Sequence, residues 1–436
     1  MNSDSFIRKY KIEILLLLVL TFSIGIRMYN LERPESYYFD EVYFAFTAQE
    51  MAKGNRAAWE SWATAPKDLA YEWTHPPLGK EISATGILIF GPNTLGWRFF
   101  QALFGGMGAL FMYLLVRNLF DSKTAGLIAA LIYSFDGFFF VLSRITMVDI
   151  FMANFLMLAS LFIVKYARTR KNIYLMLTGL FCGLSMSIKW SGVYIWEFLA
   201  GVGLFLVYYN EIYKADTKDG NYLLSLLKIV PRLFLAFVLI PIVVYILTYL
   251  PFFYHGNSFM DFLTLQQNMY IYHGGVTETH PYQSPWWQWP LLIRPVFMFY
   301  DELGGGLRAY IYLLGNPFIW WTGILFFILG AYQVFKKEYP PLLFAVVSVF
   351  AYWLPWAFSP RKIVFIYHFM PSLVFIFVII SYFLWKLWEG SRRGRIIAVA
   401  YLLLAAGVFF YFYPVLSAVP ISESAIDRFM WLSTWR

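Results

Sequence analysis

Apolar runs of about 20 residues recur from one end of the chain to the other, and they limit what it can fold into. A helix of that length crosses the hydrocarbon core of a bilayer, which is about 30 Å thick. Hydrophobic residues make up 60% of the 436 positions and charged residues only 14%, whereas an ordinary soluble chain carries roughly 25% charge. The sequence therefore predicts an all-α polytopic membrane protein.

The first run, Ile14 to Tyr29, is followed by no small-residue cleavage site, and further runs come after it. It is therefore expected to be a retained helix and not a signal peptide. The single cysteine, Cys182, excludes an internal disulfide framework. Eleven transmembrane helices are expected, near residues 14–30, 97–117, 124–140, 145–164, 173–188, 192–209, 232–253, 316–335, 341–357, 365–385 and 396–413.

The placement of basic residues predicts the orientation. The net charge is +8, and in a membrane protein excess Lys and Arg mark cytoplasmic loops, so no nucleic-acid partner is expected. With the N-terminus inside, the basic clusters of the even connections all fall in the cytoplasm, and the tail after Pro414 lies outside.

Two long connections then lie outside the membrane, at residues 31–95 and 254–315, within one membrane domain that spans residues 1–436. Loops of this length in a compact protein are usually functional. The second loop contains the aromatic, proline-interrupted stretch 285–300, which predicts a helix lying at the membrane interface. Its tryptophans, Trp286, Trp287 and Trp289, are expected at headgroup level.

The stretch "FDEVYF" (39–44) places two adjacent carboxylates, Asp40 and Glu41, in the first outer loop. They are either solvated acids at headgroup level or part of a site. The same loop holds "YEWTHPPLGKEI" (71–82), with His75 and Lys80. Its proline pair restricts the preceding residue to extended geometry, so His75 is expected to be held in place.

Six cations also map to the outer side, where the positive-inside rule predicts few. Each alone could snorkel to the headgroups, but their shared side indicates an anionic lipid phosphate as ligand. These cations are Arg98, Arg144, Lys189, Arg294, Arg361 and Lys362.

A carboxylate on this side could accept a proton from an attacking hydroxyl, while the cations stabilise a departing lipid phosphate. This arrangement is expected of an enzyme that takes a sugar from a lipid-linked phosphate. Asp40, Glu41 and Asp149 could together hold a divalent cation, but the neighbouring cations already supply positive charge, so no obligatory cofactor is expected. Phosphate-loop, HExxH and paired CxxC motifs are absent from the sequence, which argues against a nucleotide-powered pump.

Six stretches of the chain resemble, in order, motifs of the protein O-mannosyltransferase family, which belongs to the GT-C membrane glycosyltransferases. They are "FDEVYFAFTAQEMAKG", "WTHPPLGK", "GWRFFQALFGGMGALFMYLLVRNLF", "SRITMVDIF", "GLSMSIKWSG" and "HPYQSPWWQWPLLIRP". The resemblance implies a GT-C fold and inverting transfer of mannose from a polyprenyl or dolichyl phosphate to Ser or Thr hydroxyls of a polypeptide at the extracytoplasmic face.

The resemblance also implies roles for single residues. Asp40 resembles the catalytic base, Glu41 its neighbour in acceptor positioning, and Asp149 the family's second acidic position. Arg98 matches an essential arginine. Four residues of the matching elements are expected to contact the substrates: His75, Lys80, Trp190 and Trp289.

Eukaryotic relatives carry a large soluble insert, the MIR domain, for which residues 254–315 leave no room. The chain therefore resembles a prokaryotic member, placed in the plasma membrane. That leaves a lipid or cell-surface glycan open as an alternative acceptor, and it leaves open whether two copies pair. A transporter or flippase is disfavoured, because the charges gather at one face and no internal repeat is seen.

Overall fold

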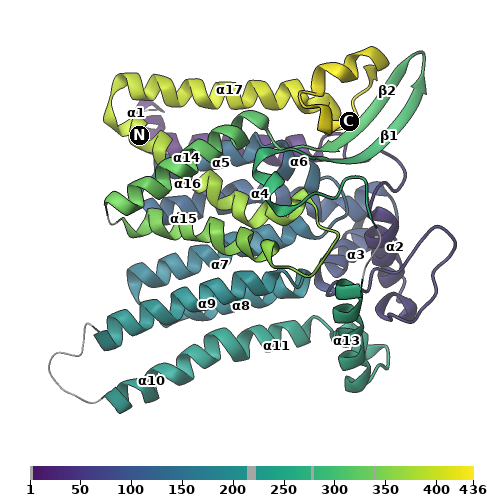
Figure 1. Ribbon diagram of the computed structural model, residues 1–436, viewed down its shortest axis with the longest axis horizontal. Coiled ribbons are helices and arrows are strands. Elements are labelled where there is room, and N and C mark those ends of the chain that lie inside the picture. The colour runs from purple at the N-terminus through teal and green to yellow at the C-terminus, as the bar shows by residue number, and fades with distance from the viewer. Residues whose placement is uncertain (1–2, 214–221, 276–278, 338) are drawn as a thin grey trace.

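The computed structural model describes residues 3–213, 222–275, 279–337 and 339–436, and most of them form helices that lie side by side (Figure 1). Within these ranges, eight helical segments are long and apolar enough to cross a membrane. The helices that build these segments are α4 (Thr94–Phe120), α7 (Asp149–Thr169), α9 (Gly192–Tyr208), α10 (Tyr222–Phe234) continued by α11 (Ile240–Leu247), α14 (Pro317–Lys336), α15 (Pro340–Trp353), α16 (Met370–Gly390) and α17 (Arg392–Leu416).

The expected count of eleven spans is not confirmed. Three expected spans fall in α1, α5 and α8, which are not among the eight segments, and α5 and α8 are apolar but shorter. The other helices are α1 (Ser3–Met28), α2 (Glu41–Ala52), α3 (Leu78–Phe90), α5 (Lys123–Ser134), α6 (Gly137–Leu142), α8 (Asn172–Ile188), α12 (Leu250–Tyr254) and α13 (Phe259–Gly275).

The expected helix at 124–140 is interrupted at Asp136. The Asp136 carboxylate accepts the backbone N–H groups of Phe138 and Phe139, and so caps the N-terminus of α6. Its second oxygen accepts hydrogen bonds from the Asn316 N–H and the Trp320 indole at the start of α14. A polar group that serves two helix starts breaks the apolar run into α5 and α6.

The centre of the bundle is formed by α16 and α7. In the apolar stretches of these two helices, 94% and 78% of the residues are buried. Helix α8 lies beside α7 and against the π-helical turn η3 (Leu235–Leu239) that joins α10 to α11. A Cβ at Gly179 of α8 would lie 1.7 Å from the Ala236 carbonyl oxygen, so this close approach requires glycine. It fixes one wall of the cavity described below.

The helices α2, α3 and α13 gather at one end of the bundle together with a β-hairpin, at the right in Figure 1. The hairpin consists of β1 (Val296–Gly304) and β2 (Leu307–Leu313), and the short strand β3 (Ile421–Ser422) pairs with β2. Gly304, Gly305 and Gly306 turn the hairpin with φ values of 80°, 60° and 74°, which favour glycine. The N-terminus lies at the opposite end of the helices from the C-terminus (Figure 1).

The prediction of an interfacial helix at 285–300 was wrong. The stretch forms a short 3₁₀ helix, η4 (Trp286–Leu291), and then enters β1. Three prolines, at positions 285, 290 and 295, remove the N–H groups that a continuous helix needs, and the following aromatic and β-branched residues favour a strand. Trp287 is exposed as expected, whereas Trp289 is buried in the core and not at a headgroup surface.

Candidate functional site

The Asp40 carboxylate is free at the start of α2. Aspartate at a helix N-cap normally accepts a hydrogen bond from the first-turn N–H groups, but Asp40 occupies this position and makes no such bond. No hydrogen-bond or ion-pair partner for its side chain is found in the described part of the chain. The preceding Phe39 has a φ of 50°, a strained value for a bulky side chain. The local fold therefore presents this carboxylate instead of using it as a cap.

Glu41, the neighbour of Asp40, is fully buried and paired. Its carboxylate accepts two hydrogen bonds from Arg98, at 2.8 and 2.7 Å, and a third at 2.9 Å from the Thr146 N–H. The remaining donors of Arg98 bind the carbonyls of Leu31, Pro34 and Ser36. Arg98 thus ties the segment before Asp40 to α4, and its guanidinium has no donor left to offer a ligand phosphate.

Arg144 holds the preceding helix in a similar way. Its guanidinium is directed at carbonyls at the end of α1 and in the turn that follows, with contacts of 2.7 Å to Arg27, 2.6 Å to Tyr29 and 2.9 Å to Asn30. A cation at a helix C-terminus satisfies free carbonyls and complements the helix dipole. This geometry favours a role for Arg144 in fixing the exit of α1, not in contacting a phosphate.

Lys80 and His75 meet at Glu72. The Lys80 ammonium is 2.7 Å from the Glu72 carboxylate and 2.8 Å from the His75 carbonyl, and the His75 Nδ1 is 2.9 Å from the same carboxylate. Burial by itself would raise the pKa of Glu72, but Lys80 and His75 outweigh it and hold that pKa well below its usual range. Lys80 is therefore a buried brace for the loop, while the His75 ring is presented to the cavity.

Asp149 and Lys189 form a second buried pair, at 2.9 Å. Asp149 opens α7 and Lys189 ends α8, so the acid lies at a helix N-terminus and the base at a helix C-terminus, where the dipoles favour each. The second carboxylate oxygen of Asp149 has no partner in the described residues. The Lys189 ammonium also lies 5.0 Å from the centre of the Tyr367 ring.

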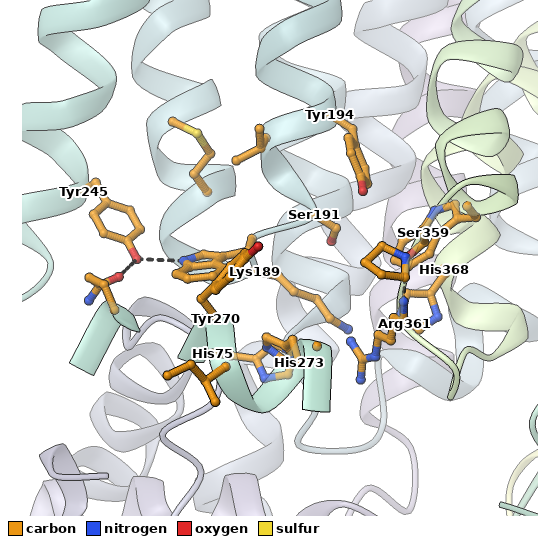
Figure 2. A pocket seen from close by; sticks show the side chains of 18 of the residues that line it. His75, Lys189, Ser191, Tyr194, Tyr245, Tyr270, His273, Ser359, Arg361 and His368 are labelled. Atoms are coloured by element: carbon orange, nitrogen blue, oxygen red, sulfur yellow. Dashed lines mark hydrogen bonds between the residues drawn. The ribbon is translucent and has the colours of Figure 1, made fainter. Parts of the chain in front are cut away.

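A cavity of about 1090 Å³ opens beside these residues. Its polar end is lined by Lys189, Arg361 and three histidines: His75, His273 and His368. Figure 2 shows the Lys189 and Arg361 side chains ending near each other, with His273 on one side and His368 on the other.

The other end of the cavity is apolar and lies between α8, α11 and α13. It is lined by Met186, Pro241, Ile242, Ile246, Phe262 and Ile271. One polar chain crosses this wall: the Trp190 indole donates to the Tyr245 hydroxyl at 3.0 Å, and Tyr245 donates to Gln266 at 2.6 Å (Figure 2). Trp190 is thus at the cavity, as a substrate contact requires.

Arg294, Lys362 and Trp289 are among the predicted residues that do not line the cavity. Arg294 binds the carbonyls of Pro281, Thr434 and Arg436, and so fastens the C-terminal segment to the hairpin base. Lys362 is exposed beside Arg361. Trp289 is buried behind His368, with ring centres 6.0 Å apart, and donates to Ser284. Arg361 and Lys189 are therefore the predicted cations that the cavity brings together.

The electrostatics of Asp40 connect it to this cavity. Burial raises the pKa of Asp40 to about 7, against the opposing pull of Lys189 and Arg361, with Asp149 and Glu72 adding to the rise. Burial lowers the pKa of His273 to about 3, and it also lowers the pKa of His75 despite Glu72. Burial thus favours the neutral forms of the His75 and His273 imidazoles, and the Asp40 carboxyl titrates near neutral pH.

The three carboxylates of Asp40, Glu41 and Asp149 are the sequence's candidates for holding a divalent cation. Among the described residues, no three acidic, His or Cys side chains are grouped so that they could hold a metal ion. Glu41 is bound to Arg98 and Asp149 to Lys189, so only Asp40 of the three has both oxygens available.

Sequence reasoning did not assign Glu72, His273 or His368 to the site. His368 had a usable signal, because a histidine at the start of an apolar span is expensive unless it has a function. His273 and Glu72 belong to the two long stretches between apolar runs, where residues of their types are common in the sequence. Only the fold brings His273 to within 5.2 Å of His75, measured between ring centres.

Comparison with known proteins extends over nearly the whole chain. Residues 17–257 match the model of the dolichyl-phosphate-mannose-protein mannosyltransferase family. Residues 258–435 match the model of the C-terminal four-transmembrane region of protein O-mannosyltransferases. A polyprenol-phosphate-mannose–protein mannosyltransferase of Mycobacterium tuberculosis is 29% identical over 83% of this chain and 81% of its own length. A protein of the same name from Corynebacterium glutamicum is 25% identical over the same shares.

Solved structures share the fold. The Saccharomyces cerevisiae protein O-mannosyltransferase Pmt1–Pmt2 complex, bound to the sugar donor, superposes with a TM-score of 0.83 at 13% identity, over 98% of this chain and 93% of that one. ArnT from Cupriavidus metallidurans, bound to undecaprenyl phosphate, gives a TM-score of 0.58 at 16% identity, over 95% and 66%. The fold is therefore that of the GT-C transferases, and the chain is a multi-pass membrane glycosyltransferase that belongs to the protein O-mannosyltransferase family.

Proposed function

We propose that the chain transfers mannose from a polyprenyl phosphate to a Ser or Thr hydroxyl of a polypeptide, with inversion and with Asp40 as the general base. The observation that carries this proposal is the unpaired, half-buried carboxylate of Asp40 close to a cavity that contains Lys189 and Arg361. The curated relatives named as polyprenol-phosphate-mannose–protein mannosyltransferases support the donor and the acceptor class.

In the proposed reaction, the acceptor oxygen attacks the anomeric carbon as the bond from that carbon to the phosphate oxygen breaks. The hydroxyl proton passes to Asp40, and the polyprenyl phosphate leaves with an added negative charge. Lys189 and Arg361 stabilise that charge because both cations line the polar end of the cavity, where the phosphate would lie. A base with a pKa near the working pH is the most effective proton acceptor, and the pKa of Asp40 is raised to about 7.

The apolar end of the cavity suits an isoprenoid chain. Its walls come from α8 and α11, two helices of the bundle, and from α13. A lipid donor can place its chain against Met186 and Ile242 while its phosphate reaches Lys189. This split between an apolar wall and a cationic end supports a lipid-linked donor over a soluble nucleotide sugar.

The proposal includes the location of the site. The N-terminus is in the cytoplasm in this proposal, and the end of the bundle with α2, α3 and the hairpin is outside the plasma membrane of a prokaryote, which the basic connections support. The solved relative in yeast is a complex of two chains, so the proposal extends to pairing of two copies, which the mass of the detergent-solubilised protein tests.

The deciding experiment mixes purified protein with polyprenyl-phosphate-linked mannose and a Ser/Thr-rich peptide, and measures the peptide mass. One added hexose, lost in Asp40→Asn, is the expected result. Parallel reactions replace the peptide by a lipid or glycan acceptor. Transfer to those acceptors but not to the peptide would refute the protein acceptor and leave the lipid donor standing.

A further inference from the structure

His368 has one ring nitrogen engaged and one free. It lies at the start of the segment that leads into α16, is 4% exposed, and lines the cavity (Figure 2). Its Nδ1 lies 3.1 Å from the Phe365 N–H and 3.0 Å from the Phe365 carbonyl oxygen. Its Nε2 is buried and has no partner among the described residues.

The backbone fixes the tautomer. The Phe365 carbonyl already accepts the His368 backbone N–H at 3.0 Å, so it is satisfied without the ring. A proton on Nδ1 would face the Phe365 N–H directly. The arrangement that suits both backbone groups leaves Nδ1 unprotonated, as the acceptor of the Phe365 N–H, and puts the ring proton on Nε2.

The free N–H is therefore a buried donor that lacks an acceptor. Such groups are costly in a protein interior, and each calls for an explanation. The ring packs against both Trp289 and Trp356, with ring centres 6.0 and 4.1 Å distant, and these contacts restrict its rotation. Lys189 and Arg361 act on it electrostatically and line the same cavity. We therefore expect the acceptor of this N–H to be a ligand in the cavity that Lys189 and Arg361 also line. A ligand that lies near two cations is expected to be an anion.

We propose that the Nε2–H of His368 donates a hydrogen bond to a phosphate oxygen of the lipid donor, as a third ligand beside Lys189 and Arg361. The inference rests on the proposed function, because it takes the donor to be a polyprenyl phosphate. It assigns His368 to ligand binding and leaves the proton transfer to Asp40.

Two substitutions distinguish the role of Nδ1 of His368 from that of its Nε2. In His368→Asn the shorter amide reaches the Nδ1 position and keeps an acceptor for Phe365, but it removes the group at Nε2. In His368→Gln the longer amide restores an N–H near Nε2. The probes are undecaprenyl monophosphate and undecaprenol, which share the chain and differ only in the phosphate, and binding is measured on detergent-solubilised full-length protein with its melting temperature alongside.

We expect His368→Asn to weaken binding of undecaprenyl monophosphate by about tenfold to a hundredfold, as for a lost hydrogen bond to a charged group, and to leave undecaprenol binding unchanged. His368→Gln should recover most of the loss. Equal affinities for the phosphate in wild type and His368→Asn would overturn the inference and leave the proposed function intact. Equal losses in both variants would also overturn it, and would assign His368 to packing. Failure of the wild-type protein to bind the phosphate would overturn the proposed donor class and the inference with it.

Discussion

At the scale of single residues, the state of Asp40 is unusual for its position. A helix start offers free N–H groups, yet this carboxylate leaves them unused, while Glu41, one residue later, is fully bound. The two adjacent acids thus have opposite environments: one supports the loop, and the other is available for chemistry.

Asp40→Asn should lower the transfer rate by about 10²–10⁴-fold, the usual contribution of a general base, without changing the melting temperature. The matched control is Asp68→Asn, the same chemical change in the same loop. Asp68 is exposed and has a φ of 63°, which asparagine tolerates well. Rates are measured at saturating donor. A rate for Asp40→Asn equal to that of the Asp68 control would remove Asp40 from the base role.

The pH dependence follows from the same residue. A general base works only when ionised, and burial raises the pKa of Asp40 to about 7. The value of kcat/KM should therefore fall as the pH drops below about 7, by about tenfold per unit at the acid end, and level off above it. Burial lowers the pKa of His273 to about 3, so this imidazole adds no second step to the profile in this range, and burial also lowers the pKa of His75. A profile that is flat across neutral pH would contradict the assignment.

Arg361 and Lys362 provide an internal comparison for the phosphate site. They are adjacent in sequence, but only Arg361 lines the cavity. Arg361→Gln should raise the KM for the lipid donor or lower turnover by about tenfold or more, since a charged hydrogen bond is lost. Lys362→Gln removes the same formal charge from the exposed neighbour and should leave both constants unchanged. Equal effects of the two changes would show that the site responds only to the overall positive charge, and not to direct contact between Arg361 and the phosphate.

At the scale of elements, the loop that presents Asp40 depends on Arg98. The side chains of Arg98 and Glu41 are both fully buried, and removing one partner of such a pair leaves an uncompensated charge that costs about 3–5 kcal/mol. Arg98→Met should lower the stability by that amount in urea unfolding.

The double variant Glu41→Gln with Arg98→Met is the control for this pair, and it should be more stable than Arg98→Met alone because no charge is left unpaired. An Arg98→Met protein that folds as well as wild type but no longer binds undecaprenyl monophosphate would contradict the bracing role. That result would indicate that Arg98 binds the donor phosphate.

Sequence patterns predicted the elements that apolar periodicity controls, and missed those set by polar contacts between distant residues. The spans that became α4, α14 and α17 follow directly from their apolar runs. The break at Asp136 depends on Asn316 and Trp320, 180 and 184 residues away, which no local pattern reveals. In the same way, the six cations were predicted as one group, but only the fold separates Lys189 and Arg361, which line the cavity, from the bracing residues Arg98 and Arg144.

At the scale of the whole molecule, the proposed reaction requires that the site end of the bundle lie outside the cell. The loop with Asp40 and the connection between α7 and α8 lie at opposite ends of the helices (Figure 1). The basic residues near the second connection, including Lys165 and Lys171, predict that it faces the cytoplasm.

Cysteine labelling tests this orientation with little background, because the one native cysteine, Cys182, is fully buried. Lys67→Cys in the first loop and Lys171→Cys at the other end both replace exposed lysines. A membrane-impermeant maleimide should label Lys67→Cys in intact cells, and should label Lys171→Cys only after the membrane is permeabilised. The reverse pattern would place the carboxylate of Asp40 in the cytosol, away from any acceptor threaded out of the membrane, and the proposed reaction could not occur there.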